Sequence, residues 1–133
     1  MQVKRWNTSR HAVFKCQYHF IWCPKYRRKV LVDGVDTRLK ELIFEKATKN
    51  GWIIHALEVM PDHVHVFAEA TVDDSPAFIV SQLKGYSAFV LRNEFPFLKS
   101  RLPSLWTRSY FCSSVGHISG STVKQYIENQ KRS

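Results

Sequence analysis

The length of 133 residues limits the chain to one domain, because a chain of this size can bury one substantial core but not two. Its 44% hydrophobic and 14% aromatic residues exclude a disordered chain, and no stretch approaches the ~20 apolar residues of a membrane span. The net charge of +9 predicts an anionic partner, with nucleic acid favoured over acidic lipid.

The first predicted element is a strand from His11 to Trp22. Its even positions are apolar or aromatic, while its odd positions include Lys15, Gln17 and His19. A period of two is typical of a strand, so we expect one buried face and one polar face.

Positive charge is concentrated before the first acidic residue, Asp33, and begins with a basic segment at residues 1–10. Cations and aromatic rings alternate there: Lys4, Arg5, Trp6, Arg10, Lys15, Tyr18, Trp22, Lys25, Tyr26, Arg27, Arg28 and Lys29. Phosphate-binding cations mixed with flat rings suit single-stranded nucleic acid, whose unstacked bases can lie on aromatic side chains. A basic, solvated N-terminus above an aromatic core is the alternative interpretation.

A first helix is predicted to start between Asp33 and Asp36 and to end at Asn50-Gly51. Its apolar stripe consists of Val35, Leu39, Leu42, Ile43 and Ala47. The next segment, residues 52–59, is rich in strand-forming residues but alternates imperfectly, with Ile53, Leu57 and Val59 on one side. Turn chemistry at Pro61-Asp62 predicts that this strand pairs as a hairpin with a strand over residues 63–70.

Ser75-Pro76 predicts a second helix that runs to about Asn93. Gly85 inside it suggests either helix packing or close backbone approach by a strand or a ligand. A loop over residues 96–103 and a last strand over residues 105–113 are expected to follow.

Residues 113–121 are a predicted hinge that leads to a tyrosine-bearing helix over residues 122–131. Thr122 and Gln125 have the spacing of a capping box at the start of that helix.

This order of elements predicts an α+β, ferredoxin-like fold for the single domain 1–133: a split βαβ, RRM-like antiparallel sheet with helices on one face, plus a C-terminal helix. Val64 and Val66 would face the helices. His63 and His65 would then lie on the open face.

Two motifs are candidates for chemistry. His63 and His65 alternate with valines on one strand, so their imidazoles project together and could form half of a metal site. Tyr126 and Gln130 are four residues apart and would share a face of the last helix. Each motif also has an interpretation without chemistry. His63 and His65 could be polar members of a half-exposed strand, and Tyr126 could belong to the apolar docking stripe of the helix, with Gln130 as a solvated neighbour.

Cys16, Cys23 and Cys112 are odd in number and form no Cys-x-x-Cys pair, so neither a disulfide framework nor a structural zinc site is indicated. The N-terminus has charge but no following apolar segment or small-residue cleavage site. We therefore expect a cytoplasmic protein with no membrane partner.

Taken together, the motifs resemble the single-tyrosine, HUH-type transposases, namely TnpA of the insertion-sequence two-hundred/six-hundred-and-five group. The resemblance covers about residues 11–131 and is carried by five segments: Tyr18-His19-Phe20-Ile21-Trp22-Cys23-Pro24-Lys25-Tyr26-Arg27, Met60-Pro61-Asp62-His63-Val64-His65, Gln82-Leu83-Lys84-Gly85-Tyr86-Ser87, Leu105-Trp106-Thr107-Arg108-Ser109-Tyr110-Phe111 and Tyr126-Ile127-Glu128-Asn129-Gln130. Ser109 departs from the glycine expected before the Tyr-Phe pair.

The resemblance implies a role for each motif. Tyr126 would be the catalytic nucleophile, and His63, His65 and Gln130 would bind a divalent metal, Mg²⁺ or Mn²⁺. Attack on single-stranded DNA would give a 5′-phosphotyrosine and a free 3′-OH, and a second 3′-OH would then resolve the linkage. No nucleotide cofactor is needed, because the bond energy is conserved.

The resemblance also implies partners: DNA hairpins at the ends of the element, and a second copy in a homodimer whose active sites are shared between subunits. The candidate DNA-binding residues are Lys15, His19, Lys25, Arg27, Arg28 and Lys84. Two other functions stay open: a domesticated relative that processes repetitive chromosomal hairpins, and a non-catalytic domain that binds single-stranded nucleic acid.

Overall fold

The computed structural model describes residues 7–8, 13–14, 16–114 and 118–130. Four antiparallel strands form the main sheet in the order β4-β5-β3-β6. They are β3 (Cys16–Trp22), β4 (Ile53–Met60), β5 (His63–Ala70) and β6 (Phe111–Ser113). Helices α1 (Val35–Asn50) and α2 (Pro76–Glu94) lie between β3 and β4 and between β5 and β6. This arrangement is a split βαβ, so the predicted α+β, ferredoxin-like fold is confirmed.

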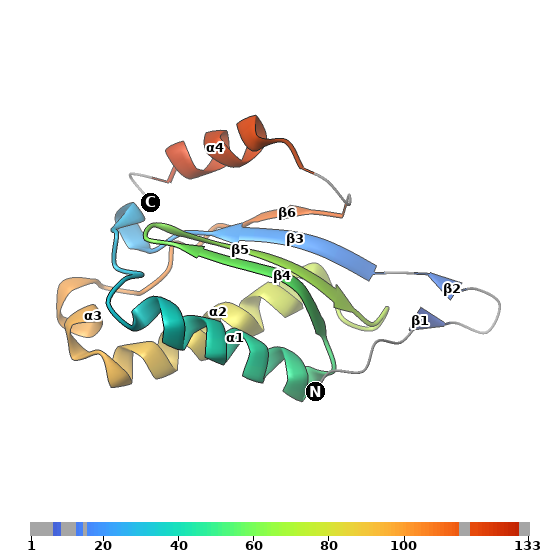
Figure 1. Ribbon diagram of the computed structural model, residues 1–133, viewed down its shortest axis with the longest axis horizontal. Coiled ribbons are helices and arrows are strands. Elements are labelled where there is room, and N and C mark those ends of the chain that lie inside the picture. The colour runs from blue at the N-terminus through green and yellow to red at the C-terminus, as the bar shows by residue number, and fades with distance from the viewer. Residues whose placement is uncertain (1–6, 9–12, 15, 115–117, 131–133) are drawn as a thin grey trace.

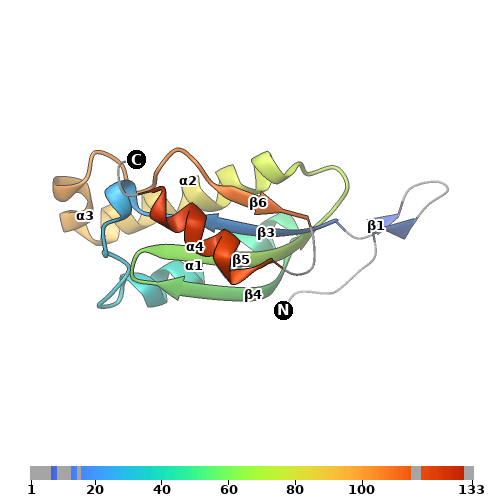
Figure 2. The same ribbon diagram turned by 90° about the horizontal axis from the view of Figure 1, so that it is seen from above.

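The sheet separates two unequal layers. Helices α1 and α2 cover one face, while the C-terminal helix α4 (Gly120–Glu128) lies over the other (Figure 1). Seen from above, α4 crosses the middle of the sheet over β3 and β5 (Figure 2). The face that carries the histidines is therefore partly covered by the tyrosine helix.

The core lies between the sheet and the two long helices. Alternate residues of β3 and β5 are fully buried there, among them Phe20, Trp22, Val64 and Val66. The predicted stripe of α1 is buried in full: Val35, Leu39, Leu42, Ile43 and Ala47. The periodicities of two and 3.6 were therefore sufficient to identify the core faces of these elements.

Local signals set the ends of the long helices. Gly51 follows α1 with φ +79°, a left-handed conformation that glycine adopts without a steric penalty. The Ser75 hydroxyl accepts a hydrogen bond from the Phe78 backbone N–H at the start of α2. The predicted bounds of both α1 and α2 are therefore confirmed to within about one helical turn.

The register of β4 differs from the predicted one. A β-bulge lies between Ile54 and Ala56, so Ile54 rather than Ile53 packs against the core with Leu57 and Val59. The extra residue shifts the alternation by one position, which explains why the pattern was imperfect.

The described residues of the predicted strand over residues 11–22 belong to two different sheets. Strand β2 (Val13–Phe14) pairs with β1 (Asn7–Thr8) in a separate two-stranded sheet, and only β3 belongs to the main sheet. Lys15, a candidate DNA-binding residue, and most of the basic segment 1–10 lie outside the described residues.

Two predictions for residues 96–113 are wrong. Residues 96–101 form the short helix α3 (Pro96–Arg101), and the last strand, β6, begins only at Phe111. The preceding chain makes a single bridge between Trp106 and Pro24, and Trp106 is buried in the core. Proline at the first position of a helix is favourable, so the Pro96 signal for a loop could equally have indicated a helix start.

The start of α4 also differs from the prediction. Its N-cap is Ser119, whose hydroxyl accepts from the Thr122 N–H, so Thr122 is not the cap of a box with Gln125. The helix ends at Glu128, and Gln130 lies in the turn beyond it. Residues 115–117 and 131–133 lie outside the described residues, so the hinge over 113–121 stays a prediction.

Gly85 is not approached closely by any other element among the described residues. A Cβ built there would meet no atom within 4 Å outside its own stretch of helix, so the close approach by a strand or packing neighbour that the sequence suggested is not seen in this part of the chain. In the described part of the chain, no helix is long and apolar enough to cross a membrane.

Candidate active site on the open face of the sheet

The two histidines project from the start of β5. His63 pairs with Met60 directly across the Pro61-Asp62 turn, and His65 lies opposite Ile21 of β3. Val64, between them, is fully buried on the other face. The alternation of side chains thus places both imidazoles on the face crossed by α4.

His63 is oriented by its neighbour in sequence. Its Nδ1 lies 2.9 Å from Oδ1 of Asp62, and a carboxylate can only accept, so Nδ1 donates the proton. The proton then occupies Nδ1 and leaves the Nε2 lone pair free. A carboxylate behind the imidazole is the usual arrangement for a metal-binding histidine.

His65 is oriented by a residue of the neighbouring strand. Its Nε2 lies 2.9 Å from Nδ1 of His19, and the His19 ring stacks on Phe67 with centroids 4.2 Å apart. Burial and the nearby His19 lower the pKa of His65, which favours the neutral imidazole that a metal requires. His19 itself is 8% exposed, so the structure places this candidate DNA-binding residue within the histidine group.

Tyr126 and Gln130 meet at the hydroxyl group of Ser109. The Ser109 hydroxyl donates to Oε1 of Gln130 at 2.8 Å, and its oxygen lies 3.2 Å from the Tyr126 phenol oxygen. While the phenol is neutral, the single Ser109 proton goes to Gln130 and the phenol donates to Ser109, whereas a phenolate oxygen would accept the Ser109 proton. Burial raises the pKa of Tyr126, and hydrogen bonds from Ser109 and Thr107 lower it in part.

Arg27 connects the two motifs. It lies in the short 3-10 helix η1 (Lys25–Arg27), and its guanidinium contacts Oδ2 of Asp62 at 3.4 Å and Oε1 of Glu128 at 3.7 Å. It also donates to the Ile127 carbonyl at 3.4 Å. The end of α4 and the turn before His63 are therefore adjacent. Neither histidine is among the hydrogen-bond partners of Tyr126 in the described residues.

Lys84 supports the segment that carries Ser109. Its Nζ donates to the backbone carbonyls of Thr107 at 2.7 Å and Ser109 at 3.1 Å. Burial lowers the pKa of Lys84 to about 8. A candidate DNA-binding residue is thus placed beneath the site, with its ammonium directed at protein carbonyls.

The remaining candidate cations lie at the surface. Lys25 is half-buried beside the Tyr26 ring, with Nζ 5.2 Å from its centroid, and Arg28 is exposed. A pocket of about 460 Å³ next to them is lined by Arg28, Lys29, Val30, Arg101 and Leu102.

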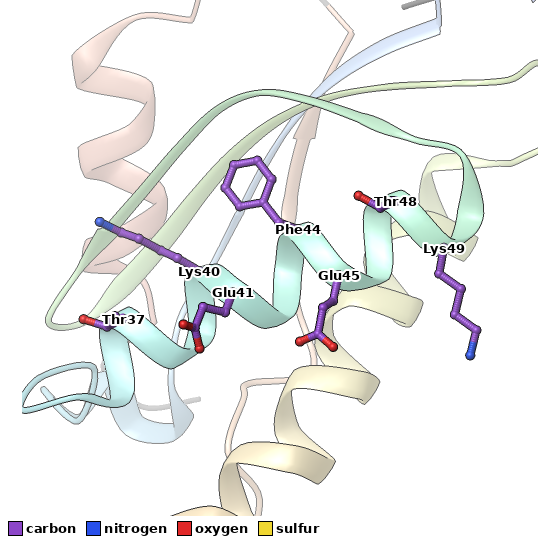
Figure 3. Close-up of a pocket in the computed structure, with 7 residues that line it drawn as sticks. All are labelled: Thr37, Lys40, Glu41, Phe44, Glu45, Thr48 and Lys49. Carbon is purple, nitrogen blue, oxygen red and sulfur yellow. The ribbon is translucent and has the colours of Figure 1, made fainter. Parts of the chain in front are cut away.

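A larger pocket of about 750 Å³ lies on the outer side of α1, in the helix layer away from the histidines (Figure 3). All seven lining residues belong to α1: Thr37, Lys40, Glu41, Phe44, Glu45, Thr48 and Lys49. Glu45 also accepts a hydrogen bond from the Tyr86 phenol of α2 at 3.5 Å. None of the sequence-predicted site residues lines this pocket.

The sequence motifs gave His63, His65, Tyr126 and Gln130 as candidates, but not the residues that orient them. Asp62 and Ser109 were noted only as turn and motif residues, and His19 and Arg27 were predicted as candidate DNA-binding residues. The parity of the first strand placed His19 on the correct face, whereas the contacts of Ser109 and Arg27 span 17 or more residues and leave no local pattern. Among the residues described, no three His, Cys, Asp or Glu side chains form a metal site.

Comparison with known proteins agrees with this geometry. Residues 12–130 match the family model described as transposase IS200 like. The chain is 39% identical over 124 residues to the ISDra2 transposase TnpA of Deinococcus radiodurans, covering 92% of this chain and 89% of that protein. It is 32% identical to the transposase for insertion sequence element IS200 of Salmonella typhimurium, covering 90% and 80% of the two chains.

Solved structures give the same result. A crystal structure of a transposase from Deinococcus radiodurans superposes with a TM-score of 0.86 and 41% identity, covering 96% of this chain and 99% of that one. A REP-associated tyrosine transposase bound to a REP hairpin has a TM-score of 0.57 at 15% identity, covering 93% and 70%. At that identity the second likeness concerns the fold alone.

Proposed function

Because this chain belongs to the IS200-like transposase family and is a DNA transposase, we propose that it cuts and rejoins single-stranded DNA at insertion-sequence ends through a 5′-phosphotyrosine on Tyr126. The observation that carries the proposal is that Tyr126 and Gln130 both contact the Ser109 hydroxyl. Arg27 also contacts both the end of α4 and Asp62, in the turn before His63.

Tyr126 has the properties that a nucleophile of this kind needs. It is half-buried on the sheet face opposite the long helices, and its phenol oxygen is held by a hydroxyl group rather than by the core. In the reaction, the phenol oxygen forms a bond to the scissile phosphorus as the bond from phosphorus to the 3′ oxygen breaks. The phenol loses its proton and the departing oxygen gains one, which gives the free 3′-OH. The raised pKa means that this proton must be removed, or its loss compensated by nearby positive charge, during the attack.

The residues present fit a divalent cation, Mg²⁺ or Mn²⁺. His63 has Nε2 free because Asp62 holds Nδ1, and His65 is favoured in the neutral form, although a cation on its Nε2 would replace the contact with Nδ1 of His19. The Gln130 amide accepts from Ser109 with one lone pair of Oε1 and retains the other. Such a cation would neutralise charge on the phosphate and align the scissile bond.

The expected DNA partner agrees with the charge of the chain. The +9 net charge favours a polyanion, and the resemblance to TnpA transposases implies that its form is a DNA hairpin at the end of the element. We further propose that the chain acts as a homodimer with shared active sites, in the cytoplasm. The predicted hinge before α4 would allow the tyrosine helix to reach a second subunit.

A covalent-adduct assay tests the proposal. Labelled single-stranded hairpins from the ends of the encoding element are incubated with the protein and Mn²⁺ or Mg²⁺, and a protease-sensitive protein–DNA adduct is expected. Tyr126→Phe should abolish the adduct and retain hairpin binding. Tyr86→Phe, on α2 in the other layer, is the matched control and should form the adduct normally. Adduct formation by Tyr126→Phe would exclude the proposed nucleophile.

A further inference from the structure

Arg27 has an unusual backbone for an arginine. Tyr26 and Arg27 have φ values of +58° and +51°, in the left-handed region that side chains other than glycine adopt at a cost. The segment immediately follows β3, and the Lys25 backbone N–H donates to the Leu105 carbonyl, which holds the turn against the body of the domain. The chain therefore leaves β3 in a strained turn that must be stabilised by other contacts.

The Arg27 side chain supplies contacts on two sides. Its exposed fraction is 17%, and its guanidinium lies against Asp62, with a side-chain exposure of 19%, and Glu128, with 50%. One donated hydrogen bond goes to the carbonyl of Ile127, directly after Tyr126. One cation thus contacts the turn before the histidines and the C-terminal end of the tyrosine helix, where cations are favourable to the helix dipole.

The two oxygens of Asp62 extend this connection to His63. Oδ2 faces Arg27, while Oδ1 accepts from Nδ1 of His63. A carboxylate with both oxygens engaged has little freedom to rotate. The position of Arg27 is therefore transmitted to the orientation of the His63 ring through one intermediate side chain.

The same contacts argue against a phosphate as the main partner of Arg27. The guanidinium faces two carboxylates, so the local charge of this group is negative rather than positive. A DNA phosphate would have to displace Asp62 or Glu128, at an electrostatic cost. Arg28, the next residue, is exposed and is the better candidate for a phosphate contact.

We propose that Arg27 is a positioning residue that ties the tyrosine helix to the histidine motif, through Glu128 and Ile127 on one side and Asp62 on the other. The consequence for transposition rests on the proposed function of Tyr126 and His63. We call these contacts of Arg27 with Asp62, Glu128 and Ile127 the clip, and the clip is present in the protein without DNA.

Hydrogen exchange on the metal-free, DNA-free protein tests the clip. Arg27→Gln should increase amide exchange in α4 roughly tenfold, as expected for the loss of a charge-assisted contact, and leave α1 unchanged. Arg28→Gln removes the same charge next to it and should leave α4 at the wild-type rate. Arg27→Lys, which keeps the positive charge but not the planar guanidinium with its several N–H donors, should give an intermediate rate of amide exchange in α4. Equal α4 exchange in Arg27→Gln and wild type would overturn the proposal.

Two further measurements complete the test. Glu128→Gln should also increase α4 exchange, and the double variant with Arg27→Gln should add little, because both changes break one contact; additive effects would contradict the clip. Should Arg27→Gln fail to fold, Glu128→Gln alone decides the question by the same readout.

Titration with Mn²⁺ alone should show weaker binding in Arg27→Gln than in Arg28→Gln, and equal affinities would remove the link to His63. A wild-type protein that forms no DNA adduct would refute the proposed function and leave these results intact.

Discussion

The hydroxyl oxygen of Ser109 lies 2.8 Å from Oε1 of Gln130 and 3.2 Å from the phenol oxygen of Tyr126. One small side chain from the segment before β6 thus holds both functional groups of the C-terminal region. Serine occurs here where the resemblance led us to expect glycine, so this chain has a contact that glycine could not make.

Ser109→Ala should destabilise the protein by about 1 kcal/mol, because Gln130 is 94% buried and would lose the donor to its amide oxygen. Urea unfolding followed by tryptophan fluorescence measures the change. Ser100→Ala, which removes an exposed hydroxyl on α3, is the control and should alter the midpoint much less. No loss of stability in Ser109→Ala would show that the amide is satisfied by another donor.

The same substitution should raise the pKa of Tyr126. Burial raises this pKa and the Ser109 hydrogen bond lowers it, so removal of the bond leaves the burial effect less opposed. The Tyr126 titration is measured as the difference in phenolate absorbance between Ser109→Ala and the double variant Ser109→Ala/Tyr126→Phe. The same difference between wild type and Tyr126→Phe gives the reference. A lower Tyr126 pKa in Ser109→Ala than in wild type would contradict the assigned direction.

Metal binding should depend on Asp62 as well as on the histidines. His63→Ala should abolish specific Mn²⁺ binding, and Asp62→Asn should weaken it by roughly tenfold or more, because the carboxylate orients the imidazole and increases its basicity. Isothermal titration with Mn²⁺ gives the affinities. Mn²⁺ should bind more tightly than Mg²⁺, since imidazole nitrogen is a poor ligand for the harder ion. His55→Ala removes another histidine of the sheet and serves as the control.

Lys84 should make stability depend on alkaline pH. Its pKa is about 8 in the folded chain, below its ordinary value of 10.5, so the unfolded chain binds more protons between these values. Stability should therefore increase as the pH rises from about 8 to 10.5, relative to a Lys84→Met variant that lacks the group. Thermal unfolding across this range measures the difference. A difference that falls with rising pH would contradict the lowered pKa.

Arg28 should contribute to DNA affinity through phosphate alone. Arg28→Gln should weaken binding of single-stranded hairpins and reduce the slope of log affinity against log salt by about 0.7, the value for one phosphate contact on a single strand. Lys49→Gln on the outer side of α1 removes an equal charge from the other layer and should leave the slope unchanged. Equal slopes in Arg28→Gln and wild type would remove Arg28 from the interface.

Much of this protein is determined by short-range pattern. Alternation in residues 16–22 and 63–70, the stripe of α1, and the caps at Gly51 and Ser75 each follow from side chains a few positions apart. Such patterns specify which face of an element is apolar, and six elements in this order leave few ways to close a sheet. The pairing of His63 with His65 is a local fact of the same kind.

Tertiary structure decided how these groups are held. The bulge in β4, the end of α4 before Gln130 and the helix at residues 96–101 depend on how elements meet, because local signals such as Pro96 permit more than one conformation. Ser109, Arg27 and His19 acquire their contacts from partners 17 to 100 residues away. Sequence spacing can place a side chain on a face, but only the packing of distant elements determines which polar group it meets there.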